Sequence, residues 1–132
     1  MAAIPDGYLD LFTTKAPLAH VATVMADGSP QVTPVWFDYV GGKVRINTAS
    51  TRVKARVLTE GAKVALSIVD PDNDYRYIQV RGVVSKVTGE GSEAHIDLLA
   101  KKYLDKDVYP WRRAGEQRLV IEIVPEKTQT MG

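Results

Sequence analysis

The segment with the strongest chemical signal spans residues 47–56, where hydroxyl side chains are followed by three cations, in the order NTASTRVKAR. If a helix begins here, Arg52, Lys54 and Arg56 lie near its positive end, and each cation there costs roughly 0.3 to 1 kcal/mol. A bound anion reverses this penalty, because free backbone N–H groups and the cations then stabilise it together. The segment therefore indicates a phosphate-binding site.

The same residues allow a second interpretation. Ser50 or Thr51 can simply cap the helix while the basic side chains remain in solvent. The spacing alone leaves both interpretations open. The sequence has no glycine-rich phosphate loop, which disfavours P-loop and dinucleotide-binding folds.

A second candidate region is the apolar run of residues 31–37, QVTPVWF. Pro34 cannot donate a hydrogen bond to a sheet, so it predicts an edge strand, a bulge or a barrel rim. Trp36 and Phe37 point to opposite faces of a strand, so at least one can line a pocket or a subunit interface. Core packing is nevertheless the more common role for either residue. Further candidates for ring binding or an interface are Tyr75, Tyr77, Tyr109 and Trp111.

Acid, base and metal chemistry receive little support. The sequence contains two histidines and no cysteine, and we interpret His20, in a predicted strand, and His95, on the polar side of a predicted helix, as structural. The acidic run at residues 70–74 alternates like a calcium loop but lacks the required glycine and glutamate, so it predicts a turn. We assign no metal site and no catalytic residue, as expected when a cofactor supplies the reactivity.

Composition narrows the class of protein. The 132 residues are expected to form one domain, residues 1–132. A formal charge of +1 argues against nucleic acid as a partner. No apolar run approaches the roughly 20 residues that a membrane span needs. The N-terminus does not read as a secretory signal, which favours a cytoplasmic location.

The elements that must position these residues are mostly strands. Alternating apolar residues predict strands at 18–26, 31–40, 43–48, 63–69, 75–87 and 118–124. Asp27-Gly28 and Gly41-Gly42 predict hairpin turns, and Gly82 marks a bend in the long fifth strand. A polar tail is expected after residue 124.

Three helices are expected between the strands. They span residues 5–14, with Pro5 at the first helical position, residues 49–60, ending at Gly61, and a segment that Ser92 caps. In the last, Ile96, Leu99 and Tyr103 follow the helical spacing. Six strands with short helices predict a mainly β (α+β) antiparallel barrel rather than a parallel sheet.

The order of a first helix, residues 18–24 (LAHVATV), residues 27–36 (DGSPQVTPVW) and the segment Thr48 to Leu58 closely resembles the pyridoxamine 5'-phosphate oxidase-like split-barrel superfamily. The resemblance covers nearly the whole chain. Within that group, the motif Arg52-x-Lys54-x-Arg56-x-Leu58 is similar to the B branch of the F420-dependent flavin/deazaflavin oxidoreductases. The resemblance implies a six-stranded split β-barrel of the FMN-binding type and a homodimer whose partner subunit closes the site.

The resemblance also implies a set of cofactor-binding residues. Its phosphate contacts come from the end of the third strand and the next helix, and its ring contacts from the second strand. Arg56 is a weaker candidate, which can instead form a structural ion pair one turn beyond Arg52. Tyr77 and Trp111 are candidates for the partner's contribution. The full set is Thr33, Pro34, Val35, Trp36, Thr48, Ala49, Ser50, Arg52, Lys54, Arg56, Tyr77 and Trp111.

The function that the resemblance implies is hydride transfer between coenzyme F420 and an unsaturated or conjugated small organic substrate. FMN is the alternative cofactor. A second basic patch of the vitamin B6 oxidases is missing from the second strand, which argues against that activity. An FMN-dependent oxidoreductase and a noncatalytic F420 carrier therefore stay open beside the leading hypothesis.

Overall fold

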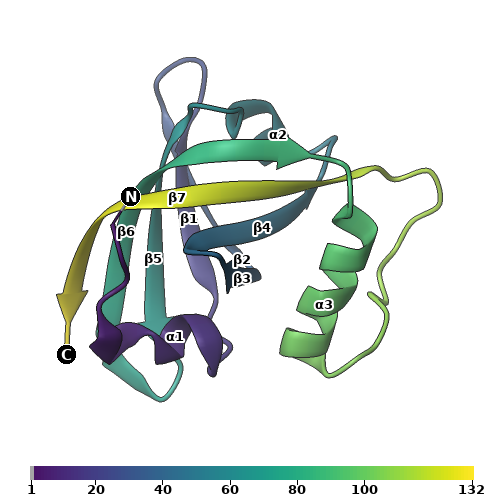
Figure 1. Ribbon diagram of the computed structural model, residues 1–132. Helices are drawn as coiled ribbons and strands as arrows, with labels where there is room; N and C mark the ends of the chain where they lie inside the picture. Colours follow the sequence, from purple (N-terminus) through teal and green to yellow (C-terminus); the bar gives the residue numbers. More distant parts are fainter. Residues whose placement is uncertain (1) are drawn as a thin grey trace.

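The computed structural model describes residues 2–132 and shows a curled antiparallel sheet with short helices around it (Figure 1). The predicted mainly β, split-barrel class is confirmed, with seven strands in place of the expected six. The strands are β1 (Ala19–Val24), β2 (Pro30–Val35), β3 (Phe37–Val40), β4 (Lys43–Ala49), β5 (Lys63–Asp70), β6 (Asn73–Thr88) and β7 (Arg118–Met131).

The additional strand arises because the predicted strand 31–40 is divided at Trp36. The sheet order is β2-β1-β5-β6-β7-β4-β3, so β2 and β3 lie at its two opposite edges although one residue separates them in the chain. The sheet must curl to bring its edges within that distance. The gap between the two edges, with Trp36 at the junction, forms part of the pocket. Pro34 lies on edge strand β2, as predicted.

Strands β6 and β7 form the longest ladder of the sheet. The expected polar tail after residue 124 is wrong, because residues 125 and 127–131 continue β7 and pair with residues 77–82 of β6. The register shifts next to Gly82, which confirms a distortion there. A side chain at Gly82 would collide with the carbonyl oxygen of Val124, so glycine is needed where the two backbones approach. Both predicted hairpins, β1–β2 and β3–β4, are present.

Alternate residues of the strands fill the barrel interior. On β4, Val44, Ile46 and Thr48 are buried, as the alternation predicts, and Ala49 at the end of the strand is buried as well. Opposite them on β7 lie Ile121 and Ile123, which pair with Ile46 and Val44. Leu11 and Phe12, from α1 (Asp10–Thr13), belong to the same apolar core.

The helices are shorter than predicted or begin elsewhere. The expected helix 5–14 consists of a 3-10 turn, η1 (Asp6–Tyr8), followed by α1, and Pro5 precedes it as the N-cap. The expected helix 49–60 is reduced to α2 (Val53–Val57), because β4 continues to Ala49 in its ladder with β7. Helix α3 (Ser92–Leu104) begins with a left-handed backbone at Gly91, so the predicted cap by Ser92 is wrong.

A charged cluster holds the N-terminal helix to the base of the barrel. We call Asp10, Lys15, Asp70, Asp72 and Arg76 the base cluster. Arg76 donates to Asp10 at 2.7 Å and to Asp70 at 2.8 Å, and Lys15 bridges Asp70 at 2.8 Å and Asp72 at 3.1 Å. The ion pairs join α1 and the residue that follows it to the β5–β6 turn, which is far away in the sequence. They therefore fix the position of α1 relative to that turn.

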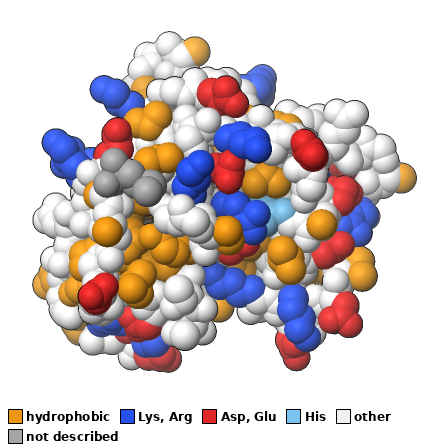
Figure 2. All heavy atoms as spheres, in the orientation of Figure 1, with side chains coloured by type: hydrophobic (Ala, Val, Ile, Leu, Met, Phe, Trp, Pro, Cys, Tyr) orange, Lys and Arg blue, Asp and Glu red, His pale blue; other side chains and the backbone are white. Residues whose placement is uncertain are grey.

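Charges elsewhere are distributed without a single dominant sign. On the face in Figure 2, basic and acidic side chains are interspersed, with hydrophobic side chains between them. In the part of the chain that the structure describes, no helix is long and apolar enough to cross a bilayer.

Candidate functional site

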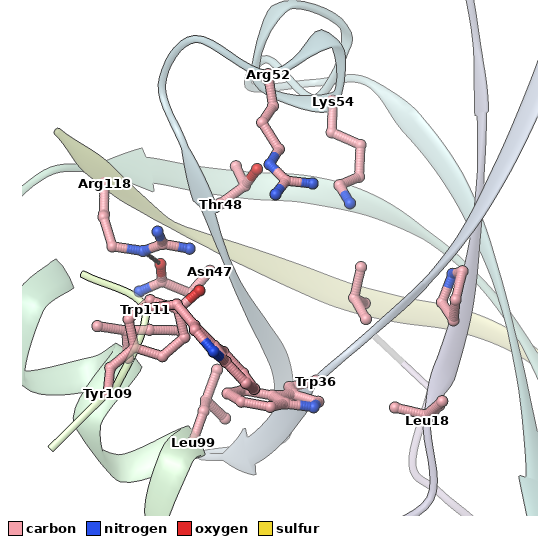
Figure 3. A pocket seen from close by; sticks show the side chains of 13 residues that line it. Leu18, Trp36, Asn47, Thr48, Arg52, Lys54, Leu99, Tyr109, Trp111 and Arg118 are labelled. Carbon is pink, nitrogen blue, oxygen red and sulfur yellow. Dashed lines mark hydrogen bonds between the residues drawn. The ribbon is translucent and has the colours of Figure 1, made fainter. Parts of the chain in front are cut away.

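A pocket of about 290 Å³ opens where the two edges of the sheet meet α3 (Figure 3). Its walls come from the residue before β1, β2, the Trp36 junction, β4, α2 and its N-cap, α3, the segment before β7 and the first residue of β7. Ligand pockets commonly begin at about 300 Å³, so this one can enclose part of a cofactor while the rest stays outside. The lining residues are Leu18, Pro34, Val35, Trp36, Asn47, Thr48, Arg52, Lys54, Ile96, Leu99, Tyr109, Trp111 and Arg118.

Lys54 is the buried cation of this pocket, with 9% of its surface exposed. It precedes Leu58 by four residues, so the two lie along one helical face, and the buried Leu58 holds that face against the barrel. The ammonium donates to the Thr33 hydroxyl at 3.2 Å. Among the described residues, it forms no ion pair with a carboxylate. Burial, with a smaller contribution from the charge of Arg52, lowers the pKa of Lys54.

Thr48 and Arg52 complete the cationic end of the pocket. Thr48 is buried, and its hydroxyl finds no hydrogen-bond partner among the residues that the structure describes. Arg52 precedes α2 in an extended conformation and has no ion pair within residues 2–132. In Figure 3 the side chains of Thr48, Arg52 and Lys54 are grouped at one end of the pocket. We call these three residues the phosphate pole.

Aromatic rings form the opposite wall. Trp36 stacks on Tyr103 with ring centroids 5.3 Å apart and lies 6.1 Å from both Tyr109 and Trp111. The Tyr103 hydroxyl donates to the carbonyl of Pro17 at 2.6 Å, and burial raises the pKa of Tyr103 to about 12. These contacts fix the plane of Trp36, so the wall offers a rigid surface for a flat ring.

A third group of residues lies between the phosphate pole and the aromatic wall. Arg118 donates from Nε to the side-chain oxygen of Asn47 at 2.6 Å and pairs with Glu116 at 2.6 Å. Its guanidinium also lies 5.1 Å from the ring of Tyr109. Arg118 is therefore held in place by its neighbours, in contrast to Arg52.

The structure brings together most of the predicted site residues. Seven of them line the pocket: Pro34, Val35, Trp36, Thr48, Arg52, Lys54 and Trp111. Thr33 lies outside the lining and accepts a hydrogen bond from the lining residue Lys54. The alternative in which Ser50 or Thr51 caps α2 is not observed, because the N-cap is Arg52 and it has no side-chain cap bond.

The remaining predicted residues lie outside the lining. Ala49 is buried, Ser50 donates its backbone N–H to Gln117, and Arg56 is exposed. The structural ion pair considered for Arg56 does not occur among the described residues. Tyr77 lies on β6 opposite Met131, and its contribution from a partner subunit stays a prediction. Trp111, the other residue suggested for the partner, lies in the pocket of its own chain.

Several lining residues were not predicted. Asn47 and Arg118 form a polar pair across β4 and β7. Strand alternation cannot reveal this pair, because the pair forms only when two segments that are distant in the sequence lie side by side. For Tyr109 the sequence predicts a role in ring binding or at an interface, and the side chain lies in the pocket lining. The prediction that His95 lies on the polar side of its helix is wrong, because 2% of its surface is exposed. Asp38 and Asn47 provide hydrogen bonds that offset its burial.

The chemistry that this pocket can perform is binding and orientation. Among the residues that the structure describes, its lining includes no carboxylate and no imidazole. It therefore combines anion-binding donors with aromatic surface, and Lys54 and Tyr109 are the side chains of the lining that can transfer a proton. Such a set suits a ligand that brings both a phosphate and a reactive ring.

Comparison with known proteins finds a matching family and solved structures of the same architecture. The family model described as pyridoxamine 5'-phosphate oxidase matches residues 7–132. A solved structure named F420 reductase is 32% identical, with a TM-score of 0.83 over 96% of this chain and 98% of that one.

More distant structures share the fold. An FAD and heme binding protein from Mycobacterium smegmatis is 20% identical, with a TM-score of 0.69 over 98% of this chain and 71% of that chain. A putative pyridoxamine 5'-phosphate oxidase from Listeria innocua is 17% identical, with a TM-score of 0.64 over 86% of each chain. No curated protein matches the sequence. From the family match and the architecture together, the chain belongs to the pyridoxamine 5'-phosphate oxidase family.

Proposed function

We propose that this protein is an oxidoreductase of the flavin-binding kind that uses coenzyme F420 to reduce an unsaturated or conjugated small organic substrate. The observation that carries the proposal is the unfinished phosphate pole. A buried ammonium without a carboxylate and a buried hydroxyl without a partner are both costly unless a ligand completes them. A phosphate offers the negative charge and the acceptor oxygens that both groups require.

The residues present fit a phosphate-bearing ring cofactor. Lys54 and Arg52 would bind the phosphate through charge-assisted hydrogen bonds, with the Thr48 hydroxyl as a third donor. Pro34 and Val35 of β2 and the indole of Trp36 would border the ring. The size of the pocket leaves a longer tail outside, which suits an extended cofactor such as F420.

The choice of F420 over FMN is supported by the similarity to the F420 reductase across almost the whole of both chains. FMN stays the second candidate, because the phosphate pole and the aromatic wall serve either ring.

The protein contributes position and exclusion of water. When bound, F420 supplies the hydride that an electron-poor double bond accepts. Arg118, fixed by Asn47 and Glu116, is placed to donate a hydrogen bond to a ligand oxygen. The buried apolar side chains of Ile96 and Leu99 limit the access of water to this part of the pocket, which strengthens each polar contact.

We also place the working site in a homodimer. Leu18 is 42% exposed at the mouth of the pocket, and Val24 and Val32, on the adjacent strands β1 and β2, are 62% and 63% exposed. A second subunit would cover these residues and the open side of the ring. Sedimentation of a monomer at micromolar concentration, with and without F420, would contradict this part of the proposal.

Parallel fluorescence titrations with F420 and FMN test the cofactor. We expect F420 to bind more tightly, and Lys54→Met to weaken its binding about 10- to 100-fold through loss of a charge-assisted bond. Arg56→Met is the matched control, because it removes a cation from the same helix outside the pocket. Equal affinities in wild type and Lys54→Met would remove the phosphate assignment, and tighter binding of FMN would identify the alternative cofactor.

A turnover assay separates the enzyme from a carrier. The F420-loaded protein should oxidise its reduced cofactor when conjugated enones or unsaturated esters are supplied. Tight F420 binding without turnover of any such acceptor would favour a protein that stores or delivers the cofactor.

A further inference from the structure

A chain of polar side chains, of which His95 is buried and the others are half-buried, connects helix α3 with the pocket. His95, on the face of α3 that packs against the sheet, contacts Asp38 of β3 through Nε2 at 3.1 Å and Asn47 of β4 through Nδ1 at 3.2 Å. Asp38 in turn accepts two bonds from Arg45, at 2.9 and 2.6 Å. Only Asn47 of these four residues lines the pocket. Asn47 is therefore the polar link between His95 and the pocket.

The donors and acceptors around Asn47 allow one orientation of its amide. Its nitrogen lies 2.9 Å from the carbonyl oxygen of Ser92, which can only accept. Its oxygen lies 2.6 Å from Nε of Arg118, which can only donate. The amide nitrogen must therefore face His95 as a donor, so His95 Nδ1 accepts and carries no proton. The single ring proton is on Nε2 and is donated to Asp38.

This arrangement determines where Arg118 points. Asn47 holds Nε of the guanidinium, and Glu116 holds Nη1 at 2.6 Å. Within the described residues these two bonds leave Nη2 for an acceptor in the pocket. A proton on His95 Nδ1 would face the amide nitrogen of Asn47, and reversal of the amide would turn that nitrogen toward Nε of Arg118. Either state sets two donors against each other, so an acceptor at Nδ1 of His95 supports the Asn47 orientation that the Ser92 carbonyl and Arg118 Nε also require.

We propose that His95 is a positioning residue whose unprotonated Nδ1 fixes Asn47 and thereby directs Arg118 toward an oxygen of the bound ring or substrate. The group that Arg118 would recognise is a carbonyl oxygen or an oxyanion on a flat ring that stacks against the aromatic wall. The identity of this ligand rests on the proposed function, whereas the direction of the Arg118 guanidinium in the free protein does not. The two parts are tested separately.

The first test needs no ligand. A long-range ¹H–¹⁵N spectrum of the imidazoles should show His95 with its proton on Nε2, and His20→Gln identifies the signal because the chain has two histidines. The Nε–H of Arg118 should give a protected resonance that Arg118→Lys removes. A proton on Nδ1 of His95 would overturn the proposal.

Two substitutions separate positioning from mere packing. His95→Asn keeps an acceptor at the δ position and should retain the Arg118 Nε–H resonance, whereas His95→Phe removes the acceptor and should lose it. If His95→Phe does not fold, Asn47→Leu tests the same link from its other end. A resonance that persists in whichever of these two variants folds would overturn the proposal.

The second test uses F420 and its phosphate-free deazaflavin alcohol as probes. His95→Phe and Arg118→Met should weaken both probes by the same factor, about three- to tenfold, since one hydrogen bond to the ring is lost or misdirected. Lys54→Met should weaken F420 alone. Unchanged affinities in His95→Phe would contradict the positioning role. If neither probe binds the wild type, the proposed function fails while the spectra still decide the aim of Arg118.

Discussion

The base cluster contains two half-buried cations, Lys15 and Arg76, and the phosphate pole contains one buried cation, Lys54, beside the exposed Arg52, but the two regions differ in how their cations are satisfied. In the base cluster, Arg76 and Lys15 each contact at least two carboxylates within 3.1 Å. In the phosphate pole, the ammonium of Lys54 donates to the Thr33 hydroxyl at 3.2 Å and has no carboxylate partner within residues 2–132. The first group completes itself within one chain, whereas the second is incomplete until something negative binds.

This difference distinguishes a structural network from a binding site. A structural ion pair is formed once, on folding, and its partners are close in space whatever ligand is present. A binding site must keep its donors free, which costs stability in the unbound protein. Substitutions in the two regions should therefore have opposite signatures, with stability affected in one and ligand affinity in the other.

The largest expected effect on folding is that of Asp70→Asn. The Asp70 side chain is buried between Lys15 and Arg76, and the substitution leaves both cations short of a partner. We expect the largest loss of stability among these charge variants, measured by urea unfolding, with F420 affinity unchanged. Asp72→Asn, at an exposed position of the same cluster, should cost much less. Equal losses in the two variants would contradict the structural role of Asp70.

The same carboxyl should govern stability in acid. The hydrogen bond from Lys15, then those from the Asp72 backbone and Arg76, hold the pKa of Asp70 below its usual value of 3.8. A lowered folded pKa means that this stabilisation is complete above pH 3.8 and is lost as pH falls further. Unfolding free energies measured from pH 5 downward should fall less steeply in Asp70→Asn. Parallel curves would show that the contribution lies elsewhere.

Lys54→Met should have the largest effect on binding. The F420 affinity falls about 10- to 100-fold with the lost charge-assisted bond. Stability should stay unchanged or rise by up to about 1 kcal/mol, because a buried charge without a carboxylate is replaced by an apolar side chain of similar length. Calorimetry and urea unfolding on one preparation check both. A destabilised variant would place Lys54 in the structural class.

Alkaline pH should sharpen the contrast. Burial lowers the pKa of Lys54 in the folded protein below the 10.5 of the unfolded chain. At a pH between the folded and the unfolded pKa, the unfolded chain binds more protons than the folded protein, so stability rises with pH. The free energy of unfolding of the wild type, minus that of Lys54→Met, should therefore increase from pH 7 to pH 10. Saturating F420 should reduce the increase, since a phosphate favours the charged lysine. A difference that is flat without ligand would contradict the burial of the ammonium.

The smallest effect is expected for Arg56→Met. This cation is exposed on α2 and lies outside the pocket lining, so stability should change by less than about 0.5 kcal/mol and F420 affinity by less than about twofold. Titrations and unfolding curves beside those of Lys54→Met measure both. A loss comparable with that of Lys54→Met would mean that net charge near α2, rather than the position of Lys54, determines binding.

Much of the sheet follows from local sequence. The alternation of Val44, Ile46 and Thr48 and the two hairpin turns predict β4 and its neighbours correctly. The division at Trp36 does not follow, because residues 31–40 are continuously compatible with one strand and only the pairing of β2 and β3 with different partners separates them. The long end of β7 was missed because its polar residues gain their pairing from β6.

The site was predictable where its residues are close in sequence. Thr48, Arg52 and Lys54 lie within seven positions, and the four-residue step from Lys54 to Leu58 marks the buried face of α2. Arg118 and Asn47 meet only because β7 pairs with β4, and the chain from Asp38 to His95 requires β3 and α3 to pack together. Pairing of distant segments decides these contacts, and local periodicity carries no record of it.

The most direct test of the account is a crystal structure of the protein with F420. We expect the phosphate within hydrogen-bond distance of Lys54 Nζ, Arg52 and the Thr48 hydroxyl, and the ring beside Trp36. A phosphate bound elsewhere, with Lys54 still bonded only to Thr33, would contradict the assignment of this pocket.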